Sequence, residues 1–131
     1  MKASELHRII PWQELKVIEQ STELGKVLDD MAQAIDHIPQ LYETDGNNEA
    51  VCQLHYFDTA GSADWYIFEV DMTTGDAFGF VNLSGEFDDP YAEYGYVNVF
   101  ELCKNARINL DLYFDGITKA EINNRRRKNE S

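Results

Sequence analysis

The fold is decided by the stretch Asp64-Trp65-Tyr66-Ile67-Phe68-Glu69-Val70-Asp71. Large apolar and aromatic side chains occupy both alternating faces of this stretch, which is typical of a strand that is buried on both sides. Turn-forming residues bound it, with Thr59-Ala60-Gly61-Ser62 before it and Thr73-Thr74-Gly75-Asp76 after it. The stretch therefore predicts a central strand that short turns connect to its neighbours in the sequence.

Two neighbouring strands follow from similar patterns. The segment 51–57 alternates as a strand does, with Cys52 and Leu54 on one face. The segment 77–83 is predicted as the next strand, and Gly79 inside it marks a close backbone approach or a bulge. Because short turns join these strands in order, the three together predict an antiparallel meander.

Helices are predicted mainly in the N-terminal part. Apolar residues at helical spacing predict a helix within 4–20, continuous from Pro11 onwards, and a second helix over 22–37 with an acidic outer face. Further strands at 94–97 and 109–114 bring the sheet to about five strands. The predicted fold class is α+β, with a mostly antiparallel twisted sheet and the N-terminal helices packed on one face.

Capping residues mark the starts of three helices. Ser21 is predicted to cap the second helix, Asn98 with Glu101 a short helix, and Thr118 with Glu121 the last helix. A chain of 131 residues has the size of one domain. That domain is predicted to span 1–124, with a helical part at 1–39 and the sheet region at 40–123. The basic run at 125–131 is predicted to be a tail.

The charge of the chain limits its partners. It carries 24 acidic and 11 basic residues, and the formal net charge is −13. The segment 27–103 holds sixteen carboxylates and neither Lys nor Arg. Such a chain favours a cationic protein partner, because phosphates would repel it from nucleic acid and from anionic membranes. With neither a secretory signal at its start nor an apolar segment of about 20 residues, it is expected in the cytoplasm of a host bacterium.

The carboxylates could imitate the phosphates of nucleic acid, but one strand could not do so alone. Duplex DNA carries about one charge per 1.7 Å of axis, whereas carboxylates on one strand face recur only about every 6.6 Å. Mimicry would therefore need carboxylates from the second helix and from the 84–93 loop to converge. The predicted partner-binding residues are Asp29, Asp30, Asp36, Glu69, Asp71, Glu86, Asp88, Asp89 and Glu93.

No catalytic, cofactor-binding or metal-binding residue is predicted. His7, His37 and His55 are too scattered for a zinc site, although a role of His55 as a general base stays open. The acidic turn at 71–76 lacks the alternating oxygen ligands of a calcium loop. The cysteines, Cys52 and Cys103, are predicted to be reduced, buried and inert.

Aromatic residues suggest a different kind of surface. Most are predicted to lie in the core, but Trp65 and Ile67 would form a contact patch if no helix covered them. That possibility leaves open a scaffold or oligomerisation module, including a homodimer, that binds a protein partner through aromatic side chains. A small hydrolase or metal-dependent enzyme is the third alternative.

Several short motifs occur in order along the chain. They are Leu41-Tyr42, Trp65-Tyr66 with Glu69 and Asp71, Phe78-Gly79-Phe80-Val81, Glu93-Tyr94-Gly95-Tyr96-Val97, Glu101-Leu102 and Asp111-Leu112-Tyr113-Phe114. In their order and spacing, these motifs resemble the bacterial family known as domain of unknown function 2958, over residues about 40–123. The resemblance implies a compact α+β fold and an origin on a plasmid, phage or other mobile element. It implies no reaction and no catalytic residue.

Charge and resemblance together predict an acidic, non-enzymatic binding protein. Its expected role is to inhibit a host defence or nucleic-acid enzyme, as anti-restriction and anti-CRISPR proteins do. The expected mechanism is that its carboxylates mimic nucleic acid in a cationic groove of that enzyme.

Overall fold

The chain is built around a five-stranded antiparallel sheet with the strand order β5-β4-β3-β2-β6. The computed structural model describes residues 1–127. The strands are β2 (Leu54–Asp58), β3 (Asp64–Val70), β4 (Asp76–Asn82), β5 (Glu93–Asn98) and β6 (Ile108–Leu110). Short β1 (Val51–Cys52) and β7 (Ile117–Thr118) pair separately. The predicted central strand and meander are confirmed, since β3 lies between β2 and β4.

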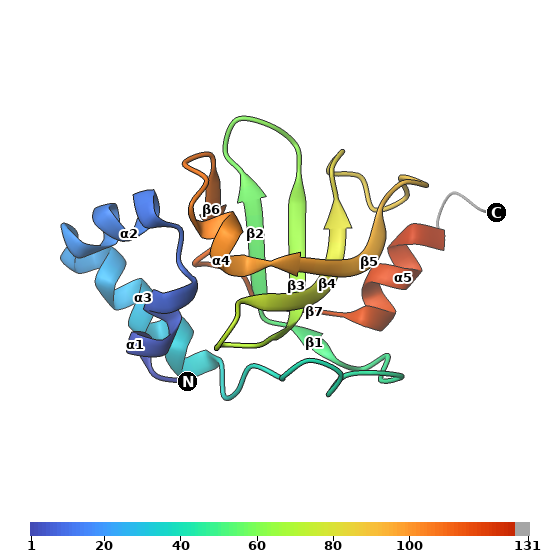
Figure 1. Cartoon of the computed structure of the whole chain (residues 1–131), viewed down its shortest axis with the longest axis horizontal. Coiled ribbons are helices and arrows are strands. Elements are labelled where there is room, and N and C mark those ends of the chain that lie inside the picture. Colours follow the sequence, from blue (N-terminus) through green and yellow to red (C-terminus); the bar gives the residue numbers. More distant parts are fainter. Residues whose placement is uncertain (128–131) are drawn as a thin grey trace.

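Helices gather at both ends of the sheet (Figure 1). They are α1 (Ala3–Leu6), the 3-10 helix η1 (His7–Ile9), α2 (Trp12–Glu19), α3 (Thr22–Ala34), α4 (Val99–Cys103) and α5 (Lys119–Arg127). All three predicted caps are confirmed: the side chains of Ser21, Asn98 and Thr118 each accept a hydrogen bond from the backbone N–H three residues later.

The sheet separates two apolar cores. On one face, Leu28 and Met31 of α3 pack with Leu54, Tyr56 and Ile67 in a core that we call the helical core. The opposite face carries an aromatic core, which is closed by α5 and by the 84–92 segment and contains Tyr66, Phe68, Phe80, Ala92 and Ile122. The predicted α+β class, with the N-terminal helices packed on one face of the sheet, is therefore confirmed.

A bulge in β3 sets the direction of its side chains. Ile67 pairs with Gly79 but Glu69 pairs with Phe78, so β3 holds one extra residue, Phe68, at this point. A Cβ atom on Gly79 would lie 2.2 Å from the Tyr66 carbonyl oxygen, so the glycine allows the two backbones to approach. Beyond the bulge, Glu69 turns toward the aromatic core and Val70 toward the helical one.

Three predicted elements differ from the observed ones. The helix predicted over 22–37 ends at Ala34, because Ile35 takes an extended conformation that buries it in the core. The strand predicted over 51–57 breaks at Gln53, so Cys52 joins the aromatic core while Leu54 lies in the helical one. The strand predicted over 109–114 stops at Leu110, because the next residue begins a turn.

The predicted basic tail is also partly wrong. Arg125 and Arg127 belong to α5 rather than to a separate tail. The guanidinium group of Arg126 lies 5.2 Å from the ring centre of Phe80, so this part of α5 packs against the aromatic core. The remainder of the predicted tail, 128–131, lies outside the described residues.

A carboxylate covers one edge of the sheet. Glu14 of α2 accepts a hydrogen bond from the backbone N–H of Leu110 in β6, at 2.7 Å. Burial, followed by the nearby carboxylate of Asp111, raises the pKa of Glu14 from its ordinary 4.5 to about 7, although the Leu110 hydrogen bond opposes this shift. Glu14 therefore joins α2 to the sheet at the cost of a poorly solvated charge above neutral pH.

Replacing Glu14 by Gln keeps the acceptor but removes the titration. The folded state binds the Glu14 proton more tightly than the unfolded state does, so this group lowers stability as pH rises from 4.5 to about 7. Thermal unfolding should therefore show that Glu14→Gln raises the Tm at about pH 8 more than at about pH 5. Glu19→Gln, on the exposed side of α2, is the control. An equal effect of Glu14→Gln at both pH values would contradict the prediction.

Candidate functional site

A buried carboxylate organises the surface around the 40–50 segment. Glu69 is 1% exposed, and its two carboxylate oxygens accept hydrogen bonds from the backbone N–H groups of Tyr42 and Thr44, each at 2.8 Å. The hydroxyl of Thr44 donates to the same carboxylate. Because a buried carboxylate needs such donors, the 40–50 segment is held against β3 at this point.

Lys119 secures the same segment from the other side. Its ammonium group donates to the carbonyl and hydroxyl oxygens of Thr44, at 2.7 and 2.9 Å. It also lies over the rings of Phe68 and Phe78, at 5.5 and 5.4 Å from their centres. Thr44 is thus hydrogen-bonded to a carboxylate on β3 and to an ammonium group on α5, which join three distant parts of the chain.

The hydrogen bonds to Glu69 place Tyr42 at the start of a row of aromatic rings. Tyr42 has a φ of 73°, which is unusual for a residue with a side chain, and it is 63% exposed. Its ring centre lies 6.3 Å from that of Tyr96, which lies 5.3 Å from Phe78, which stacks on Tyr94 at 5.9 Å. We call Tyr42, Tyr96, Phe78 and Tyr94 the ring row.

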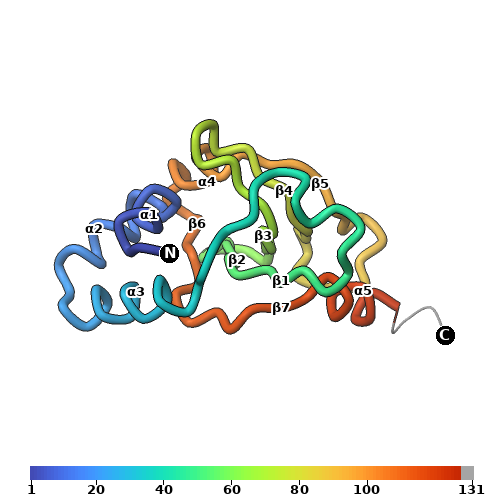
Figure 2. The backbone as a smooth tube through the Cα atoms, turned by 90° about the horizontal axis from the view of Figure 1, so that it is seen from below, coloured from blue at the N-terminus to red at the C-terminus, as the bar shows by residue number. Residues whose placement is uncertain are grey.

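The exposed end of the ring row is acidic. Partial desolvation, followed by the adjacent Tyr42 and the carboxylates of Asp45 and Glu69, raises the pKa of Tyr96 above its usual range. Tyr96 is 59% exposed, and both Glu43 and Asp45 are exposed on the neighbouring segment. Figure 2 shows this segment, between α3 and β1, passing beside β4 and β5. Exposed tyrosines and carboxylates therefore share one surface.

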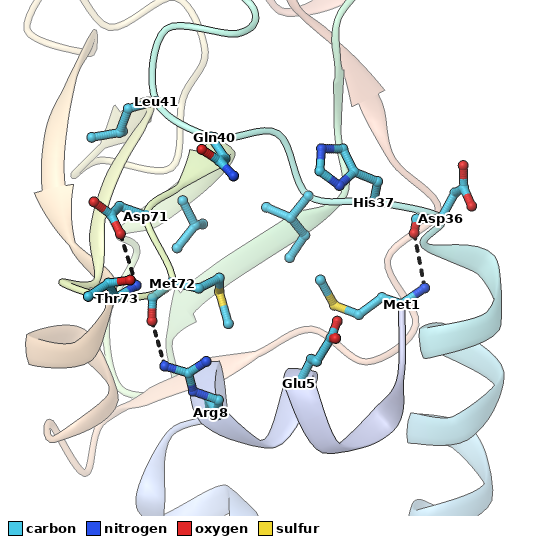
Figure 3. A pocket seen from close by; sticks show the side chains of 12 residues that line it. Met1, Glu5, Arg8, Asp36, His37, Gln40, Leu41, Asp71, Met72 and Thr73 are labelled. Carbon is cyan, nitrogen blue, oxygen red and sulfur yellow. Dashed lines mark hydrogen bonds between the residues drawn. The ribbon is translucent and has the colours of Figure 1, made fainter.

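A cleft of about 600 Å³ adjoins this surface (Figure 3). Its charged lining consists of Glu5, Arg8, Asp36, His37 and Asp71. Arg8 donates to a backbone carbonyl in the β3–β4 turn at 2.6 Å, and Asp71 accepts from the N–H of Thr73 at 2.9 Å. The first hydrogen bond joins the N-terminal helical segment to the β3–β4 turn, and the second lies within that turn. Leu41 lines the cleft and precedes the first residue of the ring row.

The predicted partner-binding residues are dispersed. Asp29 and Asp30 are exposed on α3, whereas Asp36 and Asp71 line the cleft on opposite sides (Figure 3). The prediction that Glu69 lies on the contact surface is wrong, because the bulge in β3 turns its carboxylate into the interior.

Four more predicted residues lie in the segment 84–93: Glu86, Asp88, Asp89 and Glu93. Figures 1 and 2 both place this segment at the opposite end of the molecule from α3, so the convergence expected for mimicry does not occur. The segment packs instead on basic α5: Arg126 donates to the Ala92 carbonyl at 3.1 Å, and Arg125 lies 5.0 Å from the ring centre of Phe87.

His55 has a structural environment. Its ring stacks on Tyr66 at 4.5 Å, and its two nitrogens face Asp64 at 2.6 Å and Asp111 at 3.4 Å. Both nitrogens are therefore engaged, and the imidazole ties β2 to β3 and to the turn after β6. The buried thiol of Cys52 donates to the Leu54 carbonyl, so it forms no Cys–His pair with His55.

The cysteines are buried, as predicted. Burial raises the pKa of the Cys103 thiol to about 12 and that of Cys52 well above its usual range. Within residues 1–127, no three His, Cys, Asp or Glu side chains are grouped so that they could hold a metal ion. Over the same residues, every helix is too short or too polar to cross a membrane.

The sequence did not single out the exposed end of the ring row. Most aromatic residues, Tyr96 among them, are predicted to lie in the core, and Asp45 contributes only to the excess of negative charge over residues 27–103. One signal in the sequence is that Tyr42, Glu69 and Tyr96 all belong to the motifs that resemble domain of unknown function 2958. In the structure, these three residues lie close together. Their proximity depends on the positive φ of Tyr42, which no sequence pattern predicts, and on the bulge in β3. The sequence marks a close approach or a bulge at Gly79, but it does not show that the irregularity turns Glu69 inward.

Comparison with known proteins finds no matching family model, no similar curated protein and no similar solved structure. The resemblance to domain of unknown function 2958 therefore stays a prediction.

Replacing Glu69 by Gln should destabilise the protein by about 1–3 kcal/mol, because an amide NH₂ would face the N–H donors of the 40–50 segment. Urea unfolding would measure this loss, and hydrogen exchange should report faster opening of the segment. Glu43→Gln, an exposed change in the same segment, should alter stability by less than about 0.5 kcal/mol. Equal effects of the two substitutions would contradict the role of Glu69.

Proposed function

We propose that the protein is an acidic, non-enzymatic binding protein whose partner is a cationic protein. The observation that carries this proposal is the shared surface of exposed Tyr42 and Tyr96 with Glu43 and Asp45. Aromatic side chains supply contact area at interfaces, while carboxylates select a basic partner and speed its association.

Partner and location are part of the same proposal. The partner is a nucleic-acid enzyme or defence effector in the cytoplasm of a host bacterium, and the protein inhibits it by occupying its cationic groove. Grooves that bind single-stranded nucleic acid combine positive charge along the backbone with aromatic platforms for the bases. The ring row and its carboxylates offer both kinds of contact in place of bases and phosphates. This surface replaces the dispersed carboxylates as the proposed region of mimicry.

A second candidate function is a scaffold or oligomerisation module. It is favoured by an apolar hollow of about 280 Å³ at the other end of the molecule, where α2 and α3 meet the turn after β6. Val17 and Tyr113 line this hollow and are 56% and 71% exposed. The predicted patch around Trp65 and Ile67 does not form, since Ile67 is 2% exposed and Trp65 packs against the helical core.

Two pairs of neutralised carboxylates test the proposal. Glu43→Gln with Asp45→Asn changes the proposed surface, while Asp29→Asn with Asp30→Asn removes the same charge from α3. Tagged wild-type and variant proteins would capture partners from bacterial lysate at low and high salt, with mass spectrometry to identify them. We expect a nucleic-acid-binding partner that is released as salt rises and that the first pair weakens several-fold.

Two results would count against this function. Equal weakening by both pairs would mean that only net charge matters, and capture that ignores salt would favour an apolar interface. In the second case, Val17→Ser with Tyr113→Ser should reduce the capture, which would support the scaffold function.

A further inference from the structure

β5 is the open edge of the five-stranded sheet, over the residues that the structure describes. The other edge, β6, is covered: the N–H of Leu110 is bound by the Glu14 carboxylate, and the N–H of Ile108 donates to the Asn105 carbonyl at 3.1 Å. Among residues 1–127, β5 pairs with β4 on one side and with no strand on the other. An unpaired edge is a template for another strand.

The register shows which backbone groups of β5 face outward. Val99 donates to the Gly75 carbonyl at 2.8 Å, which aligns with the Asp76–Asn98 pairing. Because hydrogen-bonded residues alternate along an antiparallel strand, Gly95 and Val97 also direct their N–H groups to β4. Tyr94 and Tyr96 therefore direct theirs to the outer edge, where no hydrogen bond within residues 1–127 uses them.

Of the features that usually protect an edge strand, β5 has a charged side chain at its first residue, Glu93. It contains no Lys and no Pro, and its pairing with β4 has no bulge. Gly95, at its middle, has open space where a side chain would be. The face of β5 on the side of Gly95 is therefore open at this position, while the ring row occupies the opposite face.

The charge around the edge selects one kind of strand. β4, β5 and the 40–50 segment contain no Lys or Arg, whereas Glu93, Glu43 and Asp45 are exposed. Arg126 of α5, which donates to the Ala92 carbonyl, places one cation at the start of β5. The rings of Tyr42 and Tyr96 lie beside the same edge. A second copy of this chain would bring two acidic surfaces together, whereas a basic extended segment would meet complementary charge.

We infer that β5 binds an extended basic segment of the partner protein as an added strand. This inference rests on the proposed function and specifies how the partner is held. The backbone of the segment pairs with Tyr94 and Tyr96, alternate basic side chains reach the carboxylates, and the others pack beside the ring row. Main-chain hydrogen bonds supply affinity in this mode of recognition, and side chains supply the selectivity.

The test uses the whole protein and a synthetic peptide of alternating lysine and valine as the probe. Tyr96→Pro removes an outward N–H and obstructs a neighbouring strand, and proline is tolerated where an edge N–H faces solvent. Tyr96→Ala is the matched variant, since it removes the same ring and keeps the N–H. Circular dichroism and thermal unfolding would verify that both variants fold.

Peptide binding should fall by about tenfold more in Tyr96→Pro than in Tyr96→Ala, the scale of a lost backbone pairing. The same peptide with alternate N-methylated backbone nitrogens should bind wild-type protein at least about tenfold more weakly, which needs no folded variant. Amide exchange measured by NMR should slow at Tyr94 and Tyr96 on binding, while Gly95 and Val97 are protected in both states.

The outcomes separate this inference from the proposed function. Salt-dependent binding that neither Tyr96→Pro nor N-methylation weakens would overturn strand addition and leave the acidic binding surface standing. Tight binding of a glutamate–valine peptide would overturn the basic partner while retaining the edge. Concentration-dependent protection of the Tyr94 and Tyr96 amides without peptide would show that a second copy occupies β5, and it would overturn the inference.

Discussion

The buried carboxylate of Glu69 is the constraint on which the surface architecture depends. A carboxylate at 1% exposure must find hydrogen-bond donors, and it finds them in the backbone of Tyr42 and Thr44. Lys119 then completes the arrangement through the hydroxyl and carbonyl of Thr44. One charged group on the central strand thereby positions a segment that has no helix or strand of its own between α3 and β1. The Glu69 carboxylate thereby fixes the backbone of Tyr42, whose ring lies beside that of Tyr96.

The two edge strands of the sheet differ in whether their outward backbone N–H groups have hydrogen-bond partners. At β6, the Glu14 carboxylate accepts the outward N–H of Leu110, so the helical end is closed. At β5, the outward N–H groups of Tyr94 and Tyr96 have no partner within residues 1–127, and exposed rings and carboxylates accompany them. The exposed carboxylates therefore have different surroundings at the two ends of the molecule. On α3 the carboxylates lie on the solvent-exposed face of a helix. Beside β5 they lie next to backbone N–H groups that have no hydrogen-bond partner within residues 1–127.

Much of the fold could be predicted because local patterns and tertiary packing agree there. The apolar segment around Ile67 became the central strand, and Ser21, Asn98 and Thr118 cap helices as their side chains favour. The predictions failed where packing overrode the local pattern. Ile35 left the helical spacing to enter the core, Gln53 interrupted a strand, and Arg125 joined α5 to pack over Phe87. For Ile35 and Arg125, the contact with a distant part of the chain prevailed over the predicted local structure.

The sequence by itself determined the α+β class, the order of the central strands and the excess of negative charge, since these follow from periodicity, turn residues and composition. Only the tertiary structure decided which carboxylates are exposed and which of them lie near one another. Glu69 lies inside because one extra residue in β3 reverses the side-chain alternation opposite Gly79. The carboxylates of α3 and of the 84–93 segment lie at opposite ends because helices and strands pack between them. Neighbours across a fold depend on register and packing, which act over distances that a local pattern does not encode.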